Sequence, residues 1–509
     1  MLLNPKPKEL CVSYQTNLNL ENSLFIGGEW VTGQGEKLYS YNPADSVELW
    51  SGNAATPTDV DAAFKAARAA FKTWGIASFD ERLAYLKAFL ELLTERKDQM
   101  AAAISAETGK VLWDAAGEVG AMLGKLNVTL QAYEERTPTR EKPLGAMRAK
   151  LTHRPHGVMA VFGPYNFPGH LPNGHIMPAL LAGNTIVFKP SEKTPMVGAE
   201  MIKLWQEAGL PAGVINLVQG ARETGETMVN HRELNGLLFT GSVPTGQAIA
   251  RTLIGRPNVI QALELGGNNP LIVTDVNDLE AAALITINSA FITSGQRCTC
   301  ARRLIVPTGA KGDQFLTILV DMIKQITVGS GEEEAFMGPV IDADAADAVL
   351  KQQKDLLAAG GKSLVEATRL DAGDAYLSPG LIDVTQVANR KDDEIFGPLL
   401  QVIRVDSLDS AIDEANNTDF GLAAGLLSDD AAEYQQFYAS ARAGIVNWNQ
   451  QLTGASSAAP FGGIGSSGNY RPSAYYAADY VAYPMASVEN PEDKVSMPAL
   501  PKGIKWERS

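Results

Sequence analysis

Hydrophobic residues recur with helical spacing in the N-terminal part of the chain. In one segment the positions i, i+4, i+7 and i+11 are apolar and therefore share one face of a helix. These positions hold Val60, Phe64, Ala67 and Phe71. Segments 83–93 and 115–130 repeat the pattern. The pattern predicts amphipathic helices that each bury one face against a core.

Further along the chain, short apolar runs alternate with helical patterns, twice in succession. Continuous apolar runs are typical of strands that are buried on both faces of a parallel sheet. The first alternation has runs at 158–162, 185–188, 214–218, 236–239 and 259–260, and a helix expected at 195–208. The second has strands expected at 271–274, 302–306, 399–405 and 421–427, and helices expected at 279–291 and 314–326. This order predicts two α/β domains, each built on a parallel sheet.

Four segments lie outside these alternations. Residues 1–23 have no clear pattern and are expected to form a poorly structured arm. Apolar runs at 24–26 and 29–31 flank two glycines, which predicts a small hairpin. The polar, proline-rich stretch 136–143 predicts a linker or a projecting ribbon, and the Gly-, Ser- and Tyr-rich end from Pro460 predicts irregular structure.

Length and composition restrict the class of protein. A chain of 509 residues is too long for one hydrophobic core, so two or three domains are expected. A net charge of −15 argues against a nucleic-acid partner, because an acidic surface repels phosphate backbones. Three cysteines exclude a disulfide framework, and there is neither a secretory signal nor an apolar run of the ~18–20 residues that cross a bilayer. We therefore expect a cytoplasmic protein with no membrane partner.

Two of the three cysteines, Cys298 and Cys300, follow the segment Gly295-Gln296-Arg297. A neighbouring cation such as Arg297 favours the thiolate, which is the nucleophilic form of cysteine. A pair of structural thiols explains the same residues equally well, so this segment alone leaves both roles open. A zinc site is not expected, because there is no second Cys pair and no His pair at ligand spacing.

Residues that could hold a nucleotide follow two of the expected strands. Gly241 and Gly246 frame a turn between a strand and a helix, where backbone N–H groups can hold a phosphate. An ordinary turn explains that spacing as well. Lys189 can donate to an adenosine ribose, and Glu192 can accept from the 2′-hydroxyl and repel a 2′-phosphate, which favours NAD over NADP. In isolation, these two residues could equally form a surface ion pair.

Three further polar residues suit catalysis or binding. Glu264 lies among apolar residues and glycines, where burial raises the pKa of a carboxyl towards that of a general base. It could also simply cap a turn. Glu394 is an acid two residues before the aromatic ring of Phe396, and Asn166 offers an amide donor between two prolines.

Taken in order, these motifs resemble the aldehyde dehydrogenase superfamily, from about residue 24 to about residue 487. The motifs that carry the resemblance are Asn166, Lys189-Pro-Ser-Glu192, Gly241 to Gly246, Glu264-Leu-Gly-Gly, Gln296-Arg-Cys298, Glu394-Ile-Phe396-Gly-Pro and Pro460-Phe-Gly-Gly463. The resemblance implies an α/β fold with two Rossmann-like parallel-sheet domains and a small β oligomerisation extension. Members of this family are enzymes, so a NAD-dependent aldehyde dehydrogenase is expected.

The resemblance also implies domain boundaries. The NAD-binding domain would comprise residues 1–135, with the N-terminal arm, and residues 153–262. Residues 263–459 would form the catalytic domain that carries the cysteine. The first part of an oligomerisation ribbon would be 136–152, and 460–509 would hold further oligomerisation strands and the tail. A homodimer or homotetramer is therefore expected.

By the same resemblance, each candidate residue has a role in the oxidation of an aldehyde. Cys298 would be the nucleophile, forming a thiohemiacetal and then a thioester, while Asn166 and the Cys298 N–H hold the oxyanion. Glu264 would activate the water that hydrolyses the thioester, and Cys300 would be buried packing. The NAD-binding residues would be Lys189 and Glu192 at the adenosine ribose, Ser242 with Gly241 and Gly246 at the pyrophosphate, and Glu394 and Phe396 at the nicotinamide ribose.

A narrower set of motifs, including the stretches 166–175 and 469–480, resembles a subfamily that acts on a carboxylated aldehyde in bacterial arginine catabolism. The loop Gly454-Ala455-Ser456-Ser457 exposes N–H and hydroxyl donors, so we expect it to anchor a carboxylate of an anionic substrate. Arg297 is a weaker candidate for this contact. It could instead lower the pKa of Cys298 or only brace its loop. The rival interpretations are a succinate or glutamate semialdehyde dehydrogenase and a catalytically silent binding protein of the same fold.

Overall fold

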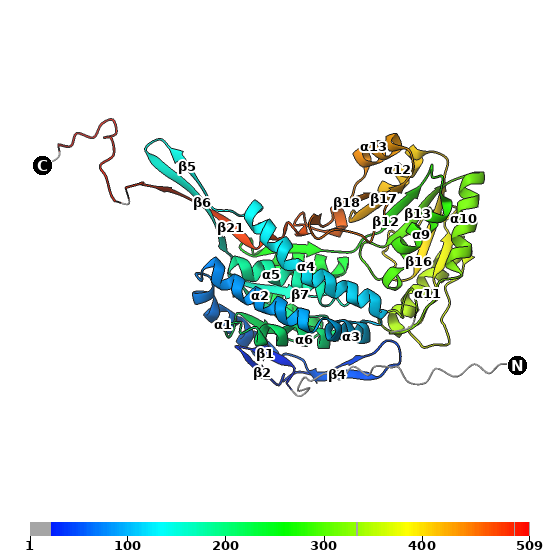
Figure 1. Cartoon of the computed structure of the whole chain (residues 1–509), viewed down its shortest axis with the longest axis horizontal. Helices are drawn as coiled ribbons and strands as arrows, with labels where there is room; N and C mark the ends of the chain where they lie inside the picture. The colour runs from blue at the N-terminus through cyan, green and yellow to red at the C-terminus, as the bar shows by residue number, and fades with distance from the viewer. Residues whose placement is uncertain (1–21, 332–333, 493, 508–509) are drawn as a thin grey trace.

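The computed structural model describes residues 22–331, 334–492 and 494–507. The predicted arm therefore lies almost entirely outside the described residues, as does Cys11. Two seven-stranded sheets, each accompanied by helices, make up the two halves of the molecule (Figure 1). This arrangement confirms the predicted α/β fold with two parallel-sheet units. Within the described ranges, no helix is long and apolar enough to cross a membrane.

The first sheet has a parallel core and an antiparallel hairpin at one edge. In spatial order its strands are β11 (Ile260–Glu264), β10 (Leu234–Thr240), β7 (Val158–Phe162), β8 (Thr185–Lys189), β9 (Ile215–Leu217), β1 (Leu24–Ile26) and β2 (Glu29–Val31). The core strands are mostly apolar, and β7 is entirely so, because helices cover the sheet and leave little room for polar side chains. The predicted hairpin is confirmed as the pair β1–β2.

Several helices belong to the first half of the molecule. They are α1 (Pro57–Trp74), α2 (Phe79–Glu95), α3 (Lys97–Thr108), α4 (Leu112–Arg136), α5 (His170–Ala182), α6 (Pro195–Glu207), α7 (Arg222–Asn230) and α8 (Val243–Leu253). The predicted segments 60–71, 83–93, 115–130 and 195–208 correspond to four of them, α1, α2, α4 and α6. The helix α3 was not predicted, because several of its polar residues are buried and it has no polar face to set against an apolar one. Helix α4 packs along α5, and this contact carries several residues of the candidate site.

The second sheet is parallel apart from its first strand. Its spatial order is β14 (Lys362–Val365), β15 (Gly380–Asp383), β16 (Leu399–Val405), β13 (Ala301–Pro307), β12 (Asn269–Val273), β17 (Ala423–Leu427) and β18 (Ile445–Trp448). Its helices are α9 (Leu279–Ala290), α10 (Ala310–Ile323), α11 (Ala343–Ala358), α12 (Leu408–Asn416) and α13 (Ala431–Ser440). The predicted strands and helices of the second alternation are all present.

A third, antiparallel sheet projects from the first half of the molecule (Figure 1). It consists of β21 (Ala482–Glu489), β6 (Met147–Pro155) and β5 (Arg140–Leu144). Of the two structures predicted for 136–143, the projecting ribbon is therefore the one observed. The prediction of irregular structure from Pro460 onward is wrong for β21, because this strand is held by backbone pairing with a distant segment that local composition does not reveal.

The remaining elements are short. They are the hairpin β3 (Lys37–Tyr41) and β4 (Glu48–Asn53), the pair β19 (Pro460–Phe461) and β20 (Ser473–Ala474), and the helix α14 (Ala477–Tyr480).

The parallel order of the first sheet gathers the candidate residues at one edge. Strands β7, β8, β10 and β11 all end there, and they lead into Asn166, Lys189, Ser242 and Glu264. Ligands of open parallel sheets bind at this carboxyl edge. A hydrogen bond from the Asn166 side chain to the carbonyl of Gln296 joins the edge to the second half of the molecule.

Candidate active site

Cys298 lies in the loop 292–300, here called the cysteine loop, between α9 and β13. The loop begins with Thr293, Ser294 and Gly295, whose φ values are 55°, 54° and 71°, in the left-handed region. This conformation is costly for a β-branched residue such as threonine, so the surroundings must hold it. At Gly295 a Cβ would overlap the carbonyl oxygen of Gly397, so only glycine fits. The turn leaves Cys298 half-buried.

Two side chains hold the backbone of the cysteine loop. The fully buried Arg302 donates from Nη2 to the carbonyl oxygen of Arg297 at 3.0 Å. Asn269 donates from Nδ2 to the carbonyl oxygens of Cys298, at 2.7 Å, and Cys300, at 2.8 Å. These bonds fix the backbone on both sides of the sulfur, which is the preorganisation that a nucleophile requires.

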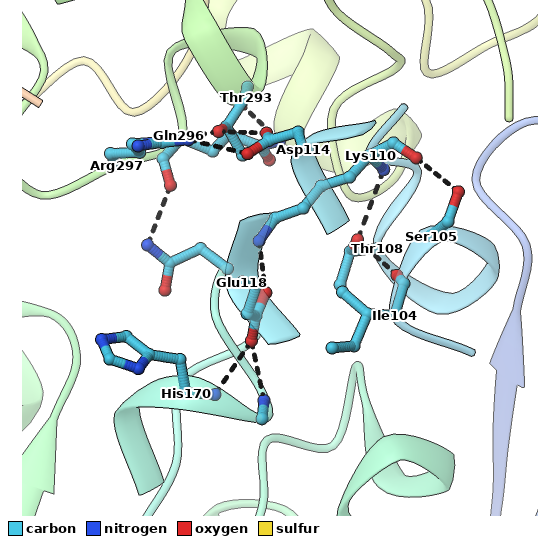
Figure 2. A network of polar contacts seen from close by, with 12 residues as sticks. Ile104, Ser105, Thr108, Lys110, Asp114, Glu118, His170, Thr293, Gln296 and Arg297 are labelled. Atoms are coloured by element: carbon cyan, nitrogen blue, oxygen red, sulfur yellow. Dashed lines mark hydrogen bonds and ion pairs between the residues drawn. The ribbon is translucent and has the colours of Figure 1, made fainter. Parts of the chain in front are cut away.

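Arg297 connects the cysteine loop to α4 (Figure 2). Its Nη2 lies 2.7 Å from Oδ1 of the buried Asp114, and its Nε donates to Oγ1 of Thr293 at 2.8 Å. Thr293 also donates to Oδ2 of Asp114 at 2.6 Å, so these three side chains form a closed network. The Nη1 of Arg297 donates to the carbonyl oxygen of Thr453 at 3.4 Å. Of the three roles that the sequence leaves open for Arg297, the structure shows the contacts of the bracing role.

The electrostatic surroundings of Cys298 oppose ionisation. Burial raises the pKa of the Cys298 thiol to about 12, and the nearby carboxyls of Glu394 and Glu264 contribute to the rise. The guanidinium of Arg302 acts in the opposite direction and lowers the pKa of this thiol. The cation that favours the thiolate is therefore Arg302, which the sequence analysis did not single out for this role.

Cys300 differs from Cys298 in accessibility. It has no exposed surface, and its Sγ lies 3.9 Å from the carbonyl oxygen of Ile292. Burial also raises the pKa of its thiol. Cys300 is thus buried, as the resemblance implied, and of these two thiols only Cys298 is partly exposed.

Asn166 lies on the loop between β7 and α5, where it is buried. Its Nδ2 donates to the carbonyl oxygen of Gln296 at 2.8 Å. Because a side-chain amide has two N–H donors, one remains for another acceptor. The backbone N–H of Cys298 donates to none of the residues that the structure describes. Two donors beside the sulfur are the arrangement that stabilises an oxyanion.

Glu264 ends β11 and is only 4% exposed. The N–H of Ser473 donates to its Oε1 at 3.1 Å, whereas its Oε2 has no hydrogen-bond partner within the described parts of the chain. A Cβ on Gly462 would lie 2.9 Å from Oε1, so the glycine turn packs closely on this carboxyl. Burial raises the pKa of Glu264 well above its ordinary value. A buried carboxyl with a free oxygen and a raised pKa suits a general base that activates water.

Lys189 and Glu192 lie together at the end of β8. The ammonium of Lys189 donates to the carbonyl oxygens of Pro190, at 3.0 Å, and Gly220, at 2.6 Å. It lies 3.7 Å from Oε2 of Glu192, whose side chain is 46% exposed. Burial lowers the pKa of Lys189, and the carboxylate of Glu192 opposes this effect. The exposed carboxylate remains accessible to a ligand.

The turn Gly241–Gly246 leads from β10 into α8. Ser242 occupies the N-cap position, but its hydroxyl contacts Oγ1 of Thr245 at 3.0 Å and does not cap the helix. Among the described residues, no side chain therefore caps the first backbone N–H groups of α8, which leaves them available as a phosphate site requires. A Cβ on Gly246 would overlap Leu265, so this glycine allows the helix to approach the next strand.

Glu394 and Phe396 lie on the loop before β16. A Cβ on Gly266 would overlap Oε2 of Glu394, so the carboxyl rests directly on a glycine backbone. Its Oε1 is buried and has no hydrogen-bond partner among the described residues, although Nη2 of Arg302 lies 3.7 Å away. The ring of Phe396 meets that of Tyr165 edge to face, at 6.0 Å between centroids. This unsatisfied acceptor beside an aromatic ring is suited to a hydroxyl of a bound ligand.

The loop Gly454–Ser457, here called the anchor loop, follows β18. Gly454 and Ser456 are exposed, and the other two residues are half-buried. The Oγ of Ser456 accepts from the N–H of Ala458 at 3.2 Å, which leaves its hydroxyl proton free to donate. Thr453, directly before the anchor loop, is the residue whose carbonyl Arg297 contacts.

Three residues of this site were missed by the sequence analysis: Asp114, Asn269 and Arg302. A weak signal existed for two of them. Asp114 is four residues before Glu118, so two acids share the face of a helix that also buries Val119 and Met122. Arg302 stands inside an apolar strand, where a charged side chain requires a specific partner. For Asn269, nothing in the local pattern indicated that it would bond a loop about thirty residues later.

Comparisons with known families and with known proteins agree with each other, and they cover most of the chain. A model of the aldehyde dehydrogenase family matches residues 30–484. The N-succinylglutamate 5-semialdehyde dehydrogenases of Chromobacterium violaceum and Pseudomonas fluorescens are 56% and 55% identical to this chain over 486 residues. Each alignment covers 95% of this chain and 99% of the relative.

Solved structures share the fold. The methylmalonate-semialdehyde dehydrogenase of Oceanimonas doudoroffii superposes with a TM-score of 0.88 at 25% identity, covering 94% of this chain and 98% of the other. The betaine aldehyde dehydrogenase of Staphylococcus aureus in complex with NAD+ superposes with a TM-score of 0.87 at 27% identity, covering 96% of this chain and 98% of the other.

Proposed function

Because the chain belongs to the aldehyde dehydrogenase family, we propose that it oxidises N-succinyl-L-glutamate 5-semialdehyde to N-succinyl-L-glutamate with NAD, in arginine degradation by the succinyltransferase route. The substrate is suggested by the relatives that are more than half identical over nearly the whole chain. The observation that carries the chemistry is the half-buried Cys298, whose backbone is held by Asn269 and Arg302 next to the amide of Asn166.

In the first step the Cys298 thiol loses its proton to solvent, and the resulting thiolate adds to the aldehyde carbon. The negative charge that develops on the aldehyde oxygen is held by the free N–H of Asn166 and the backbone N–H of Cys298. Because the cysteine loop is already fixed, no loop ordering accompanies this step. The product is a thiohemiacetal on Cys298, and loss of its hydride, which gives the thioester, is the chemistry that a bound nicotinamide supplies.

Glu264 acts in the second step. Its Oε2 has no hydrogen-bond partner among the residues that the structure describes, so it can accept a proton from a water molecule that attacks the thioester carbon. The raised pKa of Glu264 makes the carboxylate a stronger base than an exposed glutamate. The sulfur of Cys298 leaves, and the carboxylic acid is released.

The residues at the carboxyl edge of the first sheet fit a nicotinamide dinucleotide. The uncapped start of α8 at Ser242 suits the pyrophosphate, with Gly241 and Gly246 giving the turn its shape. Lys189 and Glu192 suit the adenosine ribose, and the exposed Glu192 would repel the 2′-phosphate of NADP. The unsatisfied Oε1 of Glu394 suits the nicotinamide ribose, next to Phe396.

We further propose the organisation that the family resemblance implies. The NAD-binding domain comprises 1–135 and 153–262, and the catalytic domain comprises 263–459. Residues 136–152 and 460–509 contribute the oligomerisation strands of a cytoplasmic homodimer or homotetramer. The anchor loop Gly454–Ser457 holds one substrate carboxylate, with Arg297 positioned behind it through Thr453.

The test is steady-state kinetics of the purified protein with N-succinylglutamate, succinate and glutamate semialdehydes, each with NAD and with NADP. We expect the highest kcat/KM for the N-succinyl compound with NAD. A higher kcat/KM for either of the other semialdehydes would overturn the substrate assignment. Absence of turnover with all three would favour the binding protein instead.

A further inference from the structure

One face of α4 carries a row of buried polar residues. Asp114, Glu118, Lys125 and Thr129 follow each other at intervals of four, seven and four residues, so they lie on one side of the helix, and all four are buried. Charged residues in such a position require partners, since a buried unpaired charge is costly.

Both acids of this row have partners (Figure 2). Asp114 pairs with Arg297. Glu118 lies 2.6 Å from the ammonium of Lys110, and it accepts from the backbone N–H groups of Gly169, at 2.9 Å, and His170, at 3.0 Å. Glu118 thus caps the start of α5.

Lys125, the cation of the row, has no such partner. It is 3% exposed, and within the described residues its ammonium takes part in no hydrogen bond or ion pair. Its Nζ lies against α5 at Gly174, where a Cβ would stand 3.5 Å away. Glycine inside a helix costs about 1 kcal/mol relative to alanine, and here it leaves room beside the ammonium.

The adjoining face of α5 also has unmet hydrogen-bonding capacity. His170, Asn173 and Gly174 lie at i, i+3 and i+4 and therefore share a face. The Nδ1 of His170 and both polar side-chain atoms of Asn173 are buried without a partner among the described residues, and Asn173 has no exposed surface. Burial lowers the pKa of His170 to about 3, and the charges of Lys125, Lys110 and Arg297 act in the same direction, so its ring is neutral.

We propose that Lys125, His170 and Asn173 form an anion subsite that binds one carboxylate of the substrate, remote from the aldehyde. The inference rests on the proposed function, because N-succinylglutamate semialdehyde has two carboxylates and the anchor loop accounts for only one. A carboxylate would pair with the ammonium of Lys125 and accept from the amide of Asn173 and the N–H of a neutral His170.

The subsite lies on the helix that begins beside the oxyanion donors. Asn166 precedes His170 by four residues, and from His170 to Gly174 the helix rises by about 6 Å. Because the Lys125 ammonium lies at Gly174, about one helical turn along α5 from His170, we expect a carboxylate several bonds from the aldehyde carbon to reach it. A buried lysine that has no partner among the described residues lowers the stability of the folded protein. An anion bound there would supply the missing ion pair.

The test compares Lys125→Met, which keeps length but not charge, with Lys125→Arg, which keeps the charge. Binding of the product N-succinylglutamate is measured by calorimetry. We expect Lys125→Met to weaken binding at least about tenfold, since one hydrogen-bonded ion pair is lost, and Lys125→Arg to retain most of it. The thermal midpoint of Lys125→Met should not fall, because an unpaired buried charge is removed.

Kinetics with a matched series of aldehydes shows which part of the substrate Lys125 contacts. Lys125→Met should raise KM for N-succinylglutamate semialdehyde but not for pentanal, and a smaller rise with the N-acetyl analogue would assign the distal carboxylate to this subsite. The exposed Lys65→Met controls for the change in net charge. Equal effects on charged and uncharged aldehydes, or unchanged product affinity, would overturn the subsite.

The proposed function can fail independently of the subsite. If the wild-type protein prefers another semialdehyde, the same variants are compared with the acid produced from that aldehyde. If Lys125→Met loses affinity for that acid while Lys125→Arg and Lys65→Met keep it, the subsite is still supported. Unchanged affinity in Lys125→Met would overturn it.

Discussion

Arg297 of the cysteine loop contacts Thr453, directly before the anchor loop, but the two loops are held in different ways. The cysteine loop contains a turn in a costly backbone conformation and is fixed by buried side chains from β12, β13 and α4. The anchor loop is largely exposed, and its hydroxyls keep free donors. The difference indicates that the reacting groups are fixed before the substrate arrives, whereas part of the recognition surface can adapt to it.

The largest effect is expected at the nucleophile. Cys298→Ser should lower kcat by at least about 10⁴-fold, because a serine hydroxyl is a far weaker nucleophile without an adjacent activating base. NADH production measures the loss. Cys300→Ala is the matched control, since Cys300 is buried packing, and its kcat should stay within about threefold of wild type. Normal turnover of Cys298→Ser would contradict the assignment.

The raised pKa of the Cys298 thiol predicts how its reactivity depends on pH. Since only the thiolate reacts and the pKa is about 12, the thiolate fraction should rise about tenfold for each pH unit below that value. In the protein without cofactor, alkylation of Cys298 by iodoacetamide should therefore rise about 100-fold between pH 7 and pH 9. Peptide mass spectrometry follows the modified residue. A plateau below pH 9 would show that the free enzyme already stabilises the thiolate.

The brace between α4 and the cysteine loop can be broken at Asp114. Asp114→Asn leaves the largely buried Arg297 without its counter-charge, which should cost about 3 kcal/mol of the free energy of unfolding. Urea denaturation measures the change. The kcat should fall more than KM changes, because the loop that carries the nucleophile loses a support. The exposed pair Lys351–Asp355 offers a control, and Asp355→Asn should cost less than about 1 kcal/mol.

The anchor loop should give the smallest effect. Replacing Ser456 and Ser457 by Ala should raise KM for the dicarboxylate by about tenfold or less, since two neutral hydroxyl donors are lost, one exposed and one half-buried. The kcat should be unchanged, and KM for pentanal should not move. Equal changes for the charged and the uncharged aldehyde would contradict the anchoring role.

The elements of the fold were predictable where a pattern is local. Continuous apolar runs identified β7 and β8, and one-sided apolar spacing identified α1, α2 and α4. Composition did not predict strand β21, although the family resemblance implied strands within 460–509, because β21 is specified by its pairing with β6. Helix α3 was missed since burial on several sides removes the periodic contrast.

The candidate site shows the same difference between features with a local sequence pattern and features that depend on distant contacts. Cys298, Glu264 and Asn166 were proposed through the family resemblance, because their motifs follow each other in the family order although each motif alone left its role open. The partners that hold them were not, because Asp114 and Arg297 are 183 residues apart in the sequence and meet only in the folded chain. In the sequence, Lys125 looks like an ordinary helix residue. Only the structure shows that it is buried and that its ammonium has no hydrogen-bond or ion-pair partner among the described residues.

The central claim is that Cys298 carries the acyl group and Glu264 hydrolyses it. Glu264→Gln should still form the thioester but release it slowly, so one equivalent of NADH should appear in a burst after substrate and NAD are mixed. Intact-protein and peptide mass spectrometry should then detect one N-succinylglutamyl group, bound to Cys298. An acyl group on Cys300, or steady turnover without an acyl-enzyme, would contradict the account.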